Sequence, residues 1–344
     1  MERNFEQRLS ESLNQDIKIP KSVFDKAEDA YKDIRSQKNQ QPTKRPFWGR
    51  KRWIAAAAIV LLGVAFNKPV IAAIKSTFWG NHAGIEKAVE NGYQQKIQIG
   101  SAKSQGVETN ITNLVVDSSK VALAINIKLN DISAIKDIDH VYLDMVITDD
   151  NGTVIFGEGY PGTPIKGMEN KTIINPKNGE LIYDVLLHSP SANIPQMSKL
   201  QVQIKSISFF KDNTSPAIKK IEGDWNISIA LDEQFAKTNS TAYAPQNSSK
   251  NLSIISAEML STGFVIKFIV NTPVDESILN KTHLVDSNGN SYNNSGIAHM
   301  ERTADNKNLI SMTFEVSSFD QIDSFKFSVE DINDSEVTLV KSNK

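Results

Sequence analysis

A run of fourteen apolar residues at 53–66 (WIAAAAIVLLGVAF) constrains this chain more than any other feature. The stretch just before it, residues 44–52, holds five basic residues and no acidic one: Lys44, Arg45, Arg50, Lys51 and Arg52. A basic flank followed by an apolar run is typical of a membrane segment whose positive side stays in the cytoplasm. We therefore expect a cell-membrane protein with a short cytoplasmic N-terminal part and a long extracellular C-terminal part.

The apolar run is too short to cross a membrane by itself. Fourteen helical residues span about 21 Å, against a hydrocarbon core of about 30 Å. Extending the helix to residue 74 gives about 33 Å, with Trp53 as an interfacial anchor and Asn67, Lys68 and Pro69 in the outer third. A signal peptide has an equally short apolar region. The leader of more than fifty residues carries its own helical pattern. It therefore favours an uncleaved anchor, formed by residues 53–74, and not a signal peptide.

Charge and composition exclude several classes of function. Residues 1–52 carry 13 Lys and Arg against 8 Asp and Glu, whereas residues from 75 onward carry 24 against 32. An acidic exterior part disfavours direct nucleic-acid binding, and the basic flank is explained by topology and anionic lipid. The chain has no cysteine, so disulfides, thiol nucleophiles and cysteine-ligated metals are excluded, and a bacterial envelope protein is favoured.

The cytoplasmic part, residues 1–52, contains one clear amphipathic pattern. Over residues 22–35 the apolar positions follow a helical period and form one stripe: Val23, Phe24, Ala27, Ala30, Tyr31 and Ile34. One interpretation is a loosely ordered tail whose helix touches the membrane surface. The other is a helix that binds a groove of a protein partner, and its acidic polar face favours this second interpretation.

The extracellular part changes to a period of two after a short helix at 84–91. Eight strands are predicted at 96–99, 107–116, 121–129, 141–148, 153–159, 181–188, 200–209 and 225–231. Six more follow at 252–259, 264–270, 283–286, 309–316, 324–331 and 336–340. This spacing predicts a mainly β chain with two antiparallel Ig-like β-sandwiches, at 84–235 and 252–344, joined by a polar linker at 237–251.

No motif indicates catalysis, a cofactor or a metal. The five histidines are dispersed without metal-ligand spacing, and no nucleophile elbow or phosphate-binding loop is present. The segments 286–290 and 149–152 are predicted to be hairpin turns, although the first faintly resembles a calcium loop that lacks its glutamate. Trp225 is predicted to pack in the core. We therefore expect a protein that is not an enzyme.

Three stretches resemble a known bacterial family. They are residues 19–34 (IPKSVFDKAEDAYKDI), residues 84–99 (GIEKAVENGYQQKIQI) and the strand pair that ends in DSSKVALAINIKL. The family consists of type II membrane proteins with a domain of unknown function, encoded beside extracytoplasmic-function sigma factors and treated as anti-sigma-like. The resemblance implies a cytoplasmic sigma-factor partner and an Ig-like domain from about residue 250. The zinc-binding motif of many anti-sigma proteins is absent.

Two functions remain open at this stage. In the first, the extracellular domains sense or bind an unidentified envelope ligand, and the helix at 22–35 holds a sigma factor inactive. Proteolysis would release it, and we predict the cleavable region at Asn67, Lys68, Pro69, Ala72 and Ala73, where the span is weakest. In the alternative, the protein is an envelope adhesion or scaffolding module with a passive membrane anchor.

Overall fold

A computed structural model describes residues 82–342, apart from 99, 132–137, 176–177, 213–215, 238–239 and 272–273. All of these lie in the second of two compact units, Asn67–Lys344. Among the described residues no helix is both long and apolar enough to span a membrane, and the predicted span at 53–74 lies outside them.

The described chain is mainly β, as predicted, and every strand pair in it is antiparallel. We call residues 82–236 the first domain and residues 241–342 the second domain. The first domain opens with helix α4 (Ala83–Glu90), which ends where Gly92 adopts a φ of +84°. Gly92 therefore follows directly on the helix predicted at 84–91, and glycine takes such a φ without strain.

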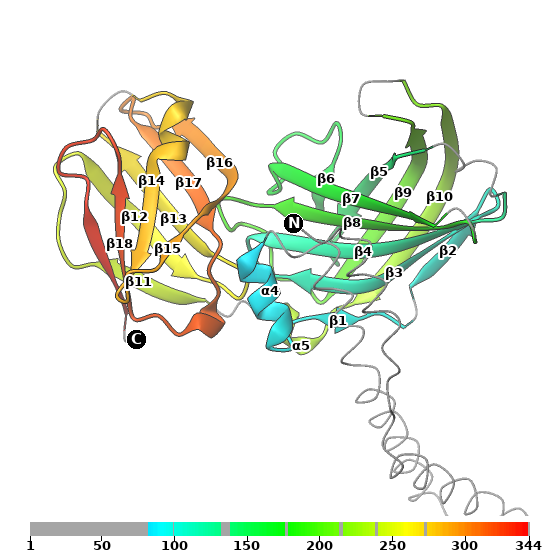
Figure 1. Cartoon of the computed structure of the whole chain (residues 1–344), viewed down its shortest axis with the longest axis horizontal. Coiled ribbons are helices and arrows are strands. Elements are labelled where there is room, and N and C mark those ends of the chain that lie inside the picture. The colour runs from blue at the N-terminus through cyan, green and yellow to red at the C-terminus, as the bar shows by residue number, and fades with distance from the viewer. Residues whose placement is uncertain are drawn as a thin grey trace, which may run out of the picture. The chain divides into compact units, whose positions relative to one another are not determined.

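Two sheets form the first domain (Figure 1). The six-stranded sheet contains β1 (Gln95–Lys96), β2 (Ser101–Ser104), β3 (Val107–Val116), β4 (Lys120–Leu129), β7 (Gly167–Asn175) and β8 (Glu180–His188). The four-stranded sheet contains β5 (His140–Thr148), β6 (Val154–Gly157), β9 (Lys199–Phe210) and β10 (Lys219–Ala230), and α5 (Glu233–Ala236) follows.

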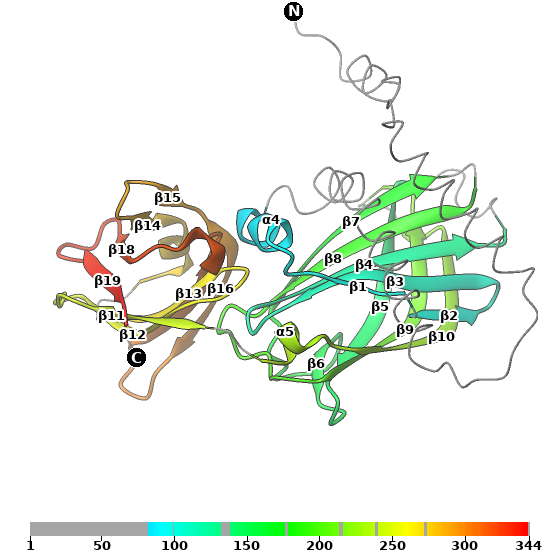
Figure 2. The ribbon, with the colours of Figure 1, turned by 90° about the horizontal axis from the view of Figure 1, so that it is seen from below.

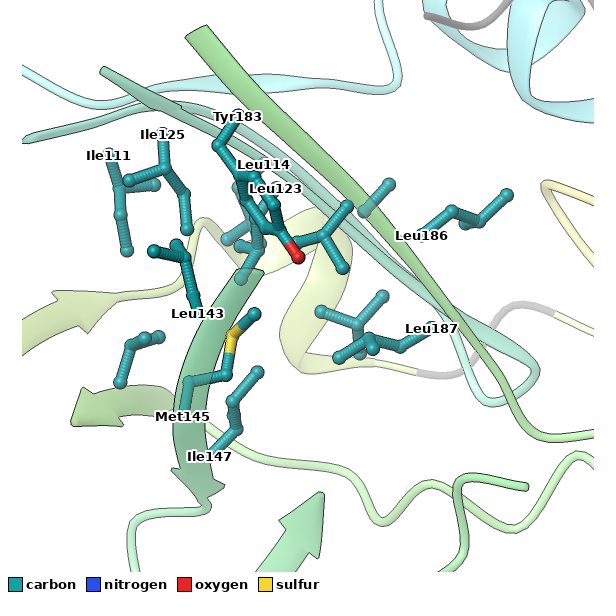
Figure 3. Packing of buried hydrophobic residues seen from close by; sticks show 14 of the residues in the cluster. Ile111, Leu114, Leu123, Ile125, Leu143, Met145, Ile147, Tyr183, Leu186 and Leu187 are labelled. Atoms are coloured by element: carbon teal, nitrogen blue, oxygen red, sulfur yellow. The ribbon is translucent and has the colours of Figure 1, made fainter. Parts of the chain in front are cut away.

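Alternating apolar residues of the two sheets build the first core. Leu123 and Ile125 of β4 and Tyr183 of β8 lie on one side, and Leu143 and Met145 of β5 lie opposite (Figure 3). Each of these five side chains is at most 1% exposed. Their period of two is the pattern that predicted the strands, because alternate residues of a strand point to the same face.

The second domain has nine strands in one continuous order. They are β11 (Thr241–Pro245), β12 (Leu252–Met259), β13 (Phe264–Val270), β14 (Thr282–Asp286), β15 (Ser291–Tyr292), β16 (Asn294–Arg302), β17 (Asn308–Phe314), β18 (Ser324–Val329) and β19 (Val337–Lys341). Two 3-10 helices, η4 (Glu276–Lys281) and η5 (Ser318–Asp320), connect them.

Strand β11 links the two halves of this order. Its first two residues pair with β12, and Tyr243–Pro245 pair with β19. Aromatic contacts join the halves across the core, with Phe264 4.7 Å from Phe325 and Phe268 5.0 Å from Phe327, measured between ring centroids. Strand β11 falls within the predicted linker 237–251, so the second domain extends back to Thr241.

Candidate functional site

The side chains predicted from the sequence to carry function all lie outside the described residues. They are the partner-binding stripe Val23, Phe24, Ala27, Tyr31 and Ile34, the topology residues Lys44, Arg45, Arg50, Lys51, Arg52 and Trp53, and the proposed cleavage region Asn67, Lys68, Pro69, Ala72 and Ala73. The described residues instead bring together a cluster of charged side chains between the two domains. We call this cluster, with helix α4 beside it, the junction. Its members are His82, Asp117, Lys120, Glu169, His188 and Glu315.

The β3–β4 hairpin contributes Asp117 to the junction. One carboxylate oxygen, Oδ1, accepts hydrogen bonds from the backbone N–H groups of Ser119 and Lys120, at 2.9 and 3.0 Å, and from the Ser119 hydroxyl. The other, Oδ2, accepts from the backbone N–H of Thr262 at 2.9 Å and from its hydroxyl at 2.6 Å. The same carboxylate therefore shapes the hairpin of the first domain and holds a turn of the second domain.

Lys120 forms a buried ion pair across the junction. Its Nζ lies 2.7 Å from Oε1 of Glu315 and donates a second hydrogen bond to the Thr262 carbonyl at 3.1 Å. The two charged side chains are only 1% and 9% exposed. Burying such a pair is costly unless the geometry is good and the remaining donors and acceptors are satisfied. Glu315 meets this condition, because its Oε2 also accepts the Gly84 N–H at 3.3 Å.

Helix α4 lies between the strands of the first domain and those of the second domain (Figure 1 and Figure 2). Ile85 and Ala88 are fully buried and belong to the first core. A Cβ added at Gly84 would lie 2.3 Å from the carbonyl oxygen of Thr262, so the close approach requires glycine. At the end of the helix, Lys87 lies 3.3 Å from Asp320 of η5.

Two buried histidines complete the cluster. His82 precedes α4 and is 8% exposed, and its Nε2 lies 3.4 Å from Glu169 and its Nδ1 3.6 Å from Glu315. His188 ends β8 and is 2% exposed, and its Nε2 lies 2.8 Å from the other oxygen of Glu169. The two imidazole rings are 5.9 Å apart between centroids. The carboxylate of Glu169 therefore serves both histidines.

The environment shifts the pKa values of these groups in different directions. Burial alone would lower the pKa of His82, but the carboxylates of Glu169 and Glu315 outweigh it and raise the pKa to about 9. Burial is the largest effect on His188 and lowers its pKa, with Lys120 and His82 acting in the same direction and Glu169 opposing them. Burial alone would raise the pKa of Glu315, but Lys120 and His82 lower it to about 2. Contacts with His188 and His82 lower the pKa of Glu169.

A cleft of about 520 Å³ lies next to these charges, lined by His82, Lys87, Tyr292, Asn294, Glu315 and Asp320 among others. Several of its polar side chains are already bonded within the protein. The Tyr292 hydroxyl donates to Asp286, and the Asn294 amide donates to the Leu279 carbonyl. Within the described residues, no group of three or more acidic, histidine or cysteine side chains is arranged to hold a metal ion. The charged side chains of the junction are paired with one another, as in Lys120 with Glu315 and His188 with Glu169.

Three other residues considered in the sequence have structural roles: Asp286 and Asp149 in hairpin turns, and Trp225 in the core. The carboxylate of Asp286 accepts four hydrogen bonds from its own hairpin, two from backbone N–H groups and one each from Asn290 and Tyr292, which confirms the turn. Asp149 likewise accepts the N–H groups of Asn151 and Thr153 in the β5–β6 hairpin. Trp225 is fully buried and donates its indole N–H to the Val107 carbonyl at 3.0 Å, which confirms core packing.

The junction is not predictable from the sequence. His82 and His188 are 106 positions apart, and nothing local in the sequence links either of them to Glu169. One signal was present. Lys120 is a charged residue that directly precedes a continuous apolar strand pattern, and it is the side chain that crosses to Glu315.

Comparisons with known proteins match part of this chain to one protein family. No match was found among curated proteins. A solved structure, "The crystal structure of the conserved domain protein from Bacillus anthracis", is similar with a TM-score of 0.42 and 12% identity, over 73% of this chain and 90% of that one. Residues 44–129 match the family described as "Domain of unknown function (DUF4179)", and this stretch includes α4, Asp117 and Lys120 of the junction.

Proposed function

We propose that the protein is a single-pass membrane regulator of the anti-sigma type. In this proposal the helix at 22–35 binds a cytoplasmic sigma factor through Val23, Phe24, Ala27, Tyr31 and Ile34. The segment 53–74 crosses the cell membrane, and the first and second domains lie outside, where they bind or sense an envelope signal. The Ig-like character of the domains belongs to the same proposal, and the resemblance of residues 19–34 and 84–129 to anti-sigma-like proteins supports it.

The observation that carries the proposal is the insertion of helix α4 into the junction. A passive anchor needs only a flexible tether between the membrane and the domains it holds. Here the first described residue after the predicted span, His82, is instead buried beside charged groups of both domains. His82 contacts Glu169 of the first domain and Glu315 of the second domain.

In this proposal an outside event reaches the predicted span through the junction. Separation of the two domains would break the contacts of Glu315 with Lys120, His82 and Gly84 together, and so would remove the hold of the second domain on the start of α4. The chain between the span and α4 would then become accessible to a protease. We propose cleavage at Asn67, Lys68, Pro69, Ala72 and Ala73, because proline removes a helix hydrogen bond there. Release of the cytoplasmic helix by cleavage does not require a single helix to transmit a small change of shape.

Co-purification from the native cell tests the partner. We expect a sigma factor to co-purify with the full-length chain, and to be lost when the four large apolar residues of the stripe, Val23, Phe24, Tyr31 and Ile34, are changed to serine. A matched variant, with Asp25, Glu28, Lys32 and Asp33 of the polar face changed to serine, should retain it. Absence of any sigma factor, or its retention by the apolar-stripe variant, contradicts the proposal and favours the scaffolding alternative.

A further inference from the structure

The cleft beside helix α4 has two walls that come from different domains. One wall is the start of α4, with Ala83 and Lys87, and the other is the stretch 291–295 of the second domain, from β15 into β16. The cleft measures about 520 Å³. Sites for small molecules have volumes of about 300–1,000 Å³ and often lie where two domains meet. The cleft is therefore large enough to hold a small organic molecule.

The second-domain wall consists of neutral side chains that form hydrogen bonds. All five residues of 291–295 line the cleft, and each carries a hydroxyl or an amide group. The side chains of Tyr292 and Asn294 are fixed by hydrogen bonds of 2.9 Å within their own domain. Ser291 and Asn293 are exposed, and their side chains have no hydrogen-bond partner among the described residues. This wall is therefore held in place and still offers a free hydroxyl and a free amide, each able to donate and to accept.

The opposite side of the cleft carries an ion pair that solvent can reach. Nζ of Lys87 lies 3.3 Å from Oδ1 of Asp320, and the two side chains are 42% and 25% exposed. Such a pair contributes little to stability because water screens it. A lysine has three N–H donors, and an ionised aspartate only accepts. The pair therefore presents a donor and an acceptor side by side to the hydroxyl groups of a ligand.

The charges along the cleft are already balanced within the protein. Lys87 is paired with Asp320, and His82 lies 3.6 Å from Glu315. The positive N-terminal end of α4 is also occupied, because the Gly84 N–H donates to the Glu315 carboxylate. A phosphate or carboxylate ligand would need donors that no carboxylate of the protein already binds. The arrangement therefore favours a ligand without net charge.

The lining is also too polar for an apolar ligand. Sites for such ligands are lined mainly by aliphatic and aromatic side chains. Of the described residues that line this cleft, only Ala83 and the ring of Tyr292 supply apolar surface. A tyrosine ring with its hydroxyl already bonded is a rigid surface against which C–H groups can pack. A neutral ligand with many hydroxyl groups and a few C–H faces matches this lining, and a sugar has both.

We propose that the cleft is a binding site for a neutral saccharide the size of a disaccharide. Its hydroxyl groups accept from Lys87, donate to Asp320 and exchange hydrogen bonds with Ser291 and Asn293, and a C–H face packs on Tyr292. Such a ligand contacts α4 and the second domain at once, so its binding stabilises the junction by mass action. The role of this saccharide as an envelope signal rests on the proposed function, whereas the binding itself is tested without a sigma factor.

Isothermal titration calorimetry of the full-length chain tests the site. The chain is held in lipid nanodiscs, without sugar-based detergent, and is titrated with cellobiose, maltose and N,N′-diacetylchitobiose. We expect at least one of these disaccharides to bind with a Kd of about 1 mM or lower. At ten times that Kd, the N–H groups of Gly84 and Thr262 should exchange about tenfold more slowly, because binding favours the closed junction.

Two substitutions in the cleft should weaken binding, and two matched ones outside it should not. Lys87→Met and Asn293→Ala should each raise the Kd at least about tenfold, since each removes polar partners of the sugar. Lys128→Met changes an exposed lysine that is paired with Glu180 on β4, and Asn288→Ala changes an exposed amide in the turn before β15. Both control chains should bind like the parent.

Three results would overturn the saccharide site. The first is a parent chain that binds none of the disaccharides at about 10 mM. The second is inorganic phosphate that binds more tightly than every disaccharide and is displaced by Lys87→Met, because the site would then be one for anions. The third is a disaccharide whose Kd is the same in the cleft variants and in the parent. A sigma factor that still co-purifies in any of these cases would leave the proposed function standing without this ligand.

Discussion

Removing the positive charge of Lys120 is the most informative single change in the junction. Lys120→Met keeps the length and apolar stem of the side chain but leaves Glu315 buried without its partner at 2.7 Å. The glutamate retains the Gly84 N–H at 3.3 Å and His82 at 3.6 Å. These two contacts compensate in part, so the charge is not wholly isolated.

The expected cost follows from the burial of the pair. Breaking a buried ion pair by removing one partner typically costs about 3–5 kcal/mol, because the remaining charge stays desolvated. Since Glu315 keeps two other contacts, we expect the lower end, about 3 kcal/mol. At about 1.4 kcal/mol per factor of ten, the open form of the junction becomes about 100-fold more populated.

Hydrogen exchange of the full-length chain measures this population directly. The N–H of Gly84 is bonded to Glu315 and the N–H of Thr262 to Asp117, so both should exchange about 100-fold faster in Lys120→Met. The N–H groups between β5 and β9 in the first core should be unchanged. The double variant Lys120→Met with Glu315→Gln removes both charges, and its exchange should return to within about tenfold of the parent chain.

Two results would refute this reasoning. The first is a Lys120→Met chain in which exchange at Gly84 and Thr262 rises less than tenfold. The second is a double variant that exchanges faster than the single one, because two favourable charges would then act independently and not as a pair.

Three further changes test the packing around the junction and in the cores. Asp184→Asn should stabilise the chain by roughly 1–3 kcal/mol at pH 8. Burial raises the pKa of Asp184 to about 6, so the ionised carboxylate is disfavoured in the folded chain at that pH. Urea unfolding at several pH values measures the gain in stability. Gly84→Ala should displace α4, because its Cβ would meet the Thr262 carbonyl at 2.3 Å, and limited proteolysis should then cut faster near the start of the helix. Trp225→Phe should cost about 1–3 kcal/mol by leaving the buried Val107 carbonyl without its donor, as measured by urea unfolding followed by circular dichroism.

Each of these three predictions has an outcome that would contradict it. The gain from Asp184→Asn should vanish near pH 3, where the carboxyl is protonated in both folded and unfolded chains, so a constant gain would point to another cause. Unchanged proteolysis of Gly84→Ala would mean that α4 does not need its close approach to the turn, and Ala83→Ser, at an exposed position, is the neutral control. A Trp225→Phe chain as stable as the parent would show that the Val107 carbonyl finds another donor.

The strands that the sequence predicted well are those with a strong apolar pattern. Strands β3, β12 and β13 have the predicted bounds, because each is rich in buried apolar residues that suit a strand. The prediction missed β7 and β16, whose residues are mostly half-buried or exposed. Each of these strands has a paired neighbour on one side only, so its sequence carries less of the core pattern.

The junction could not be predicted in the same way. Its side chains come from segments whose partners lie far along the chain, such as Lys120 with Glu315 and His82 with Glu169. Hydrophobic periodicity describes how one segment faces a core, but it holds no information about which charged groups meet across two domains. In the sequence the histidines are dispersed, whereas the structure brings His82 and His188 into one cluster.

The central claim is that the junction controls whether the N-terminal helix stays bound to its proposed cytoplasmic partner. The most direct test measures the sigma factor that co-purifies with the full-length chain, with Lys120→Met, and with the Lys120→Met, Glu315→Gln double variant. We predict that the parent chain retains the sigma factor, that Lys120→Met loses most of it with cleavage before α4, and that the double variant recovers it. Full retention by Lys120→Met, in a chain whose hydrogen exchange shows an open junction, would contradict the claim.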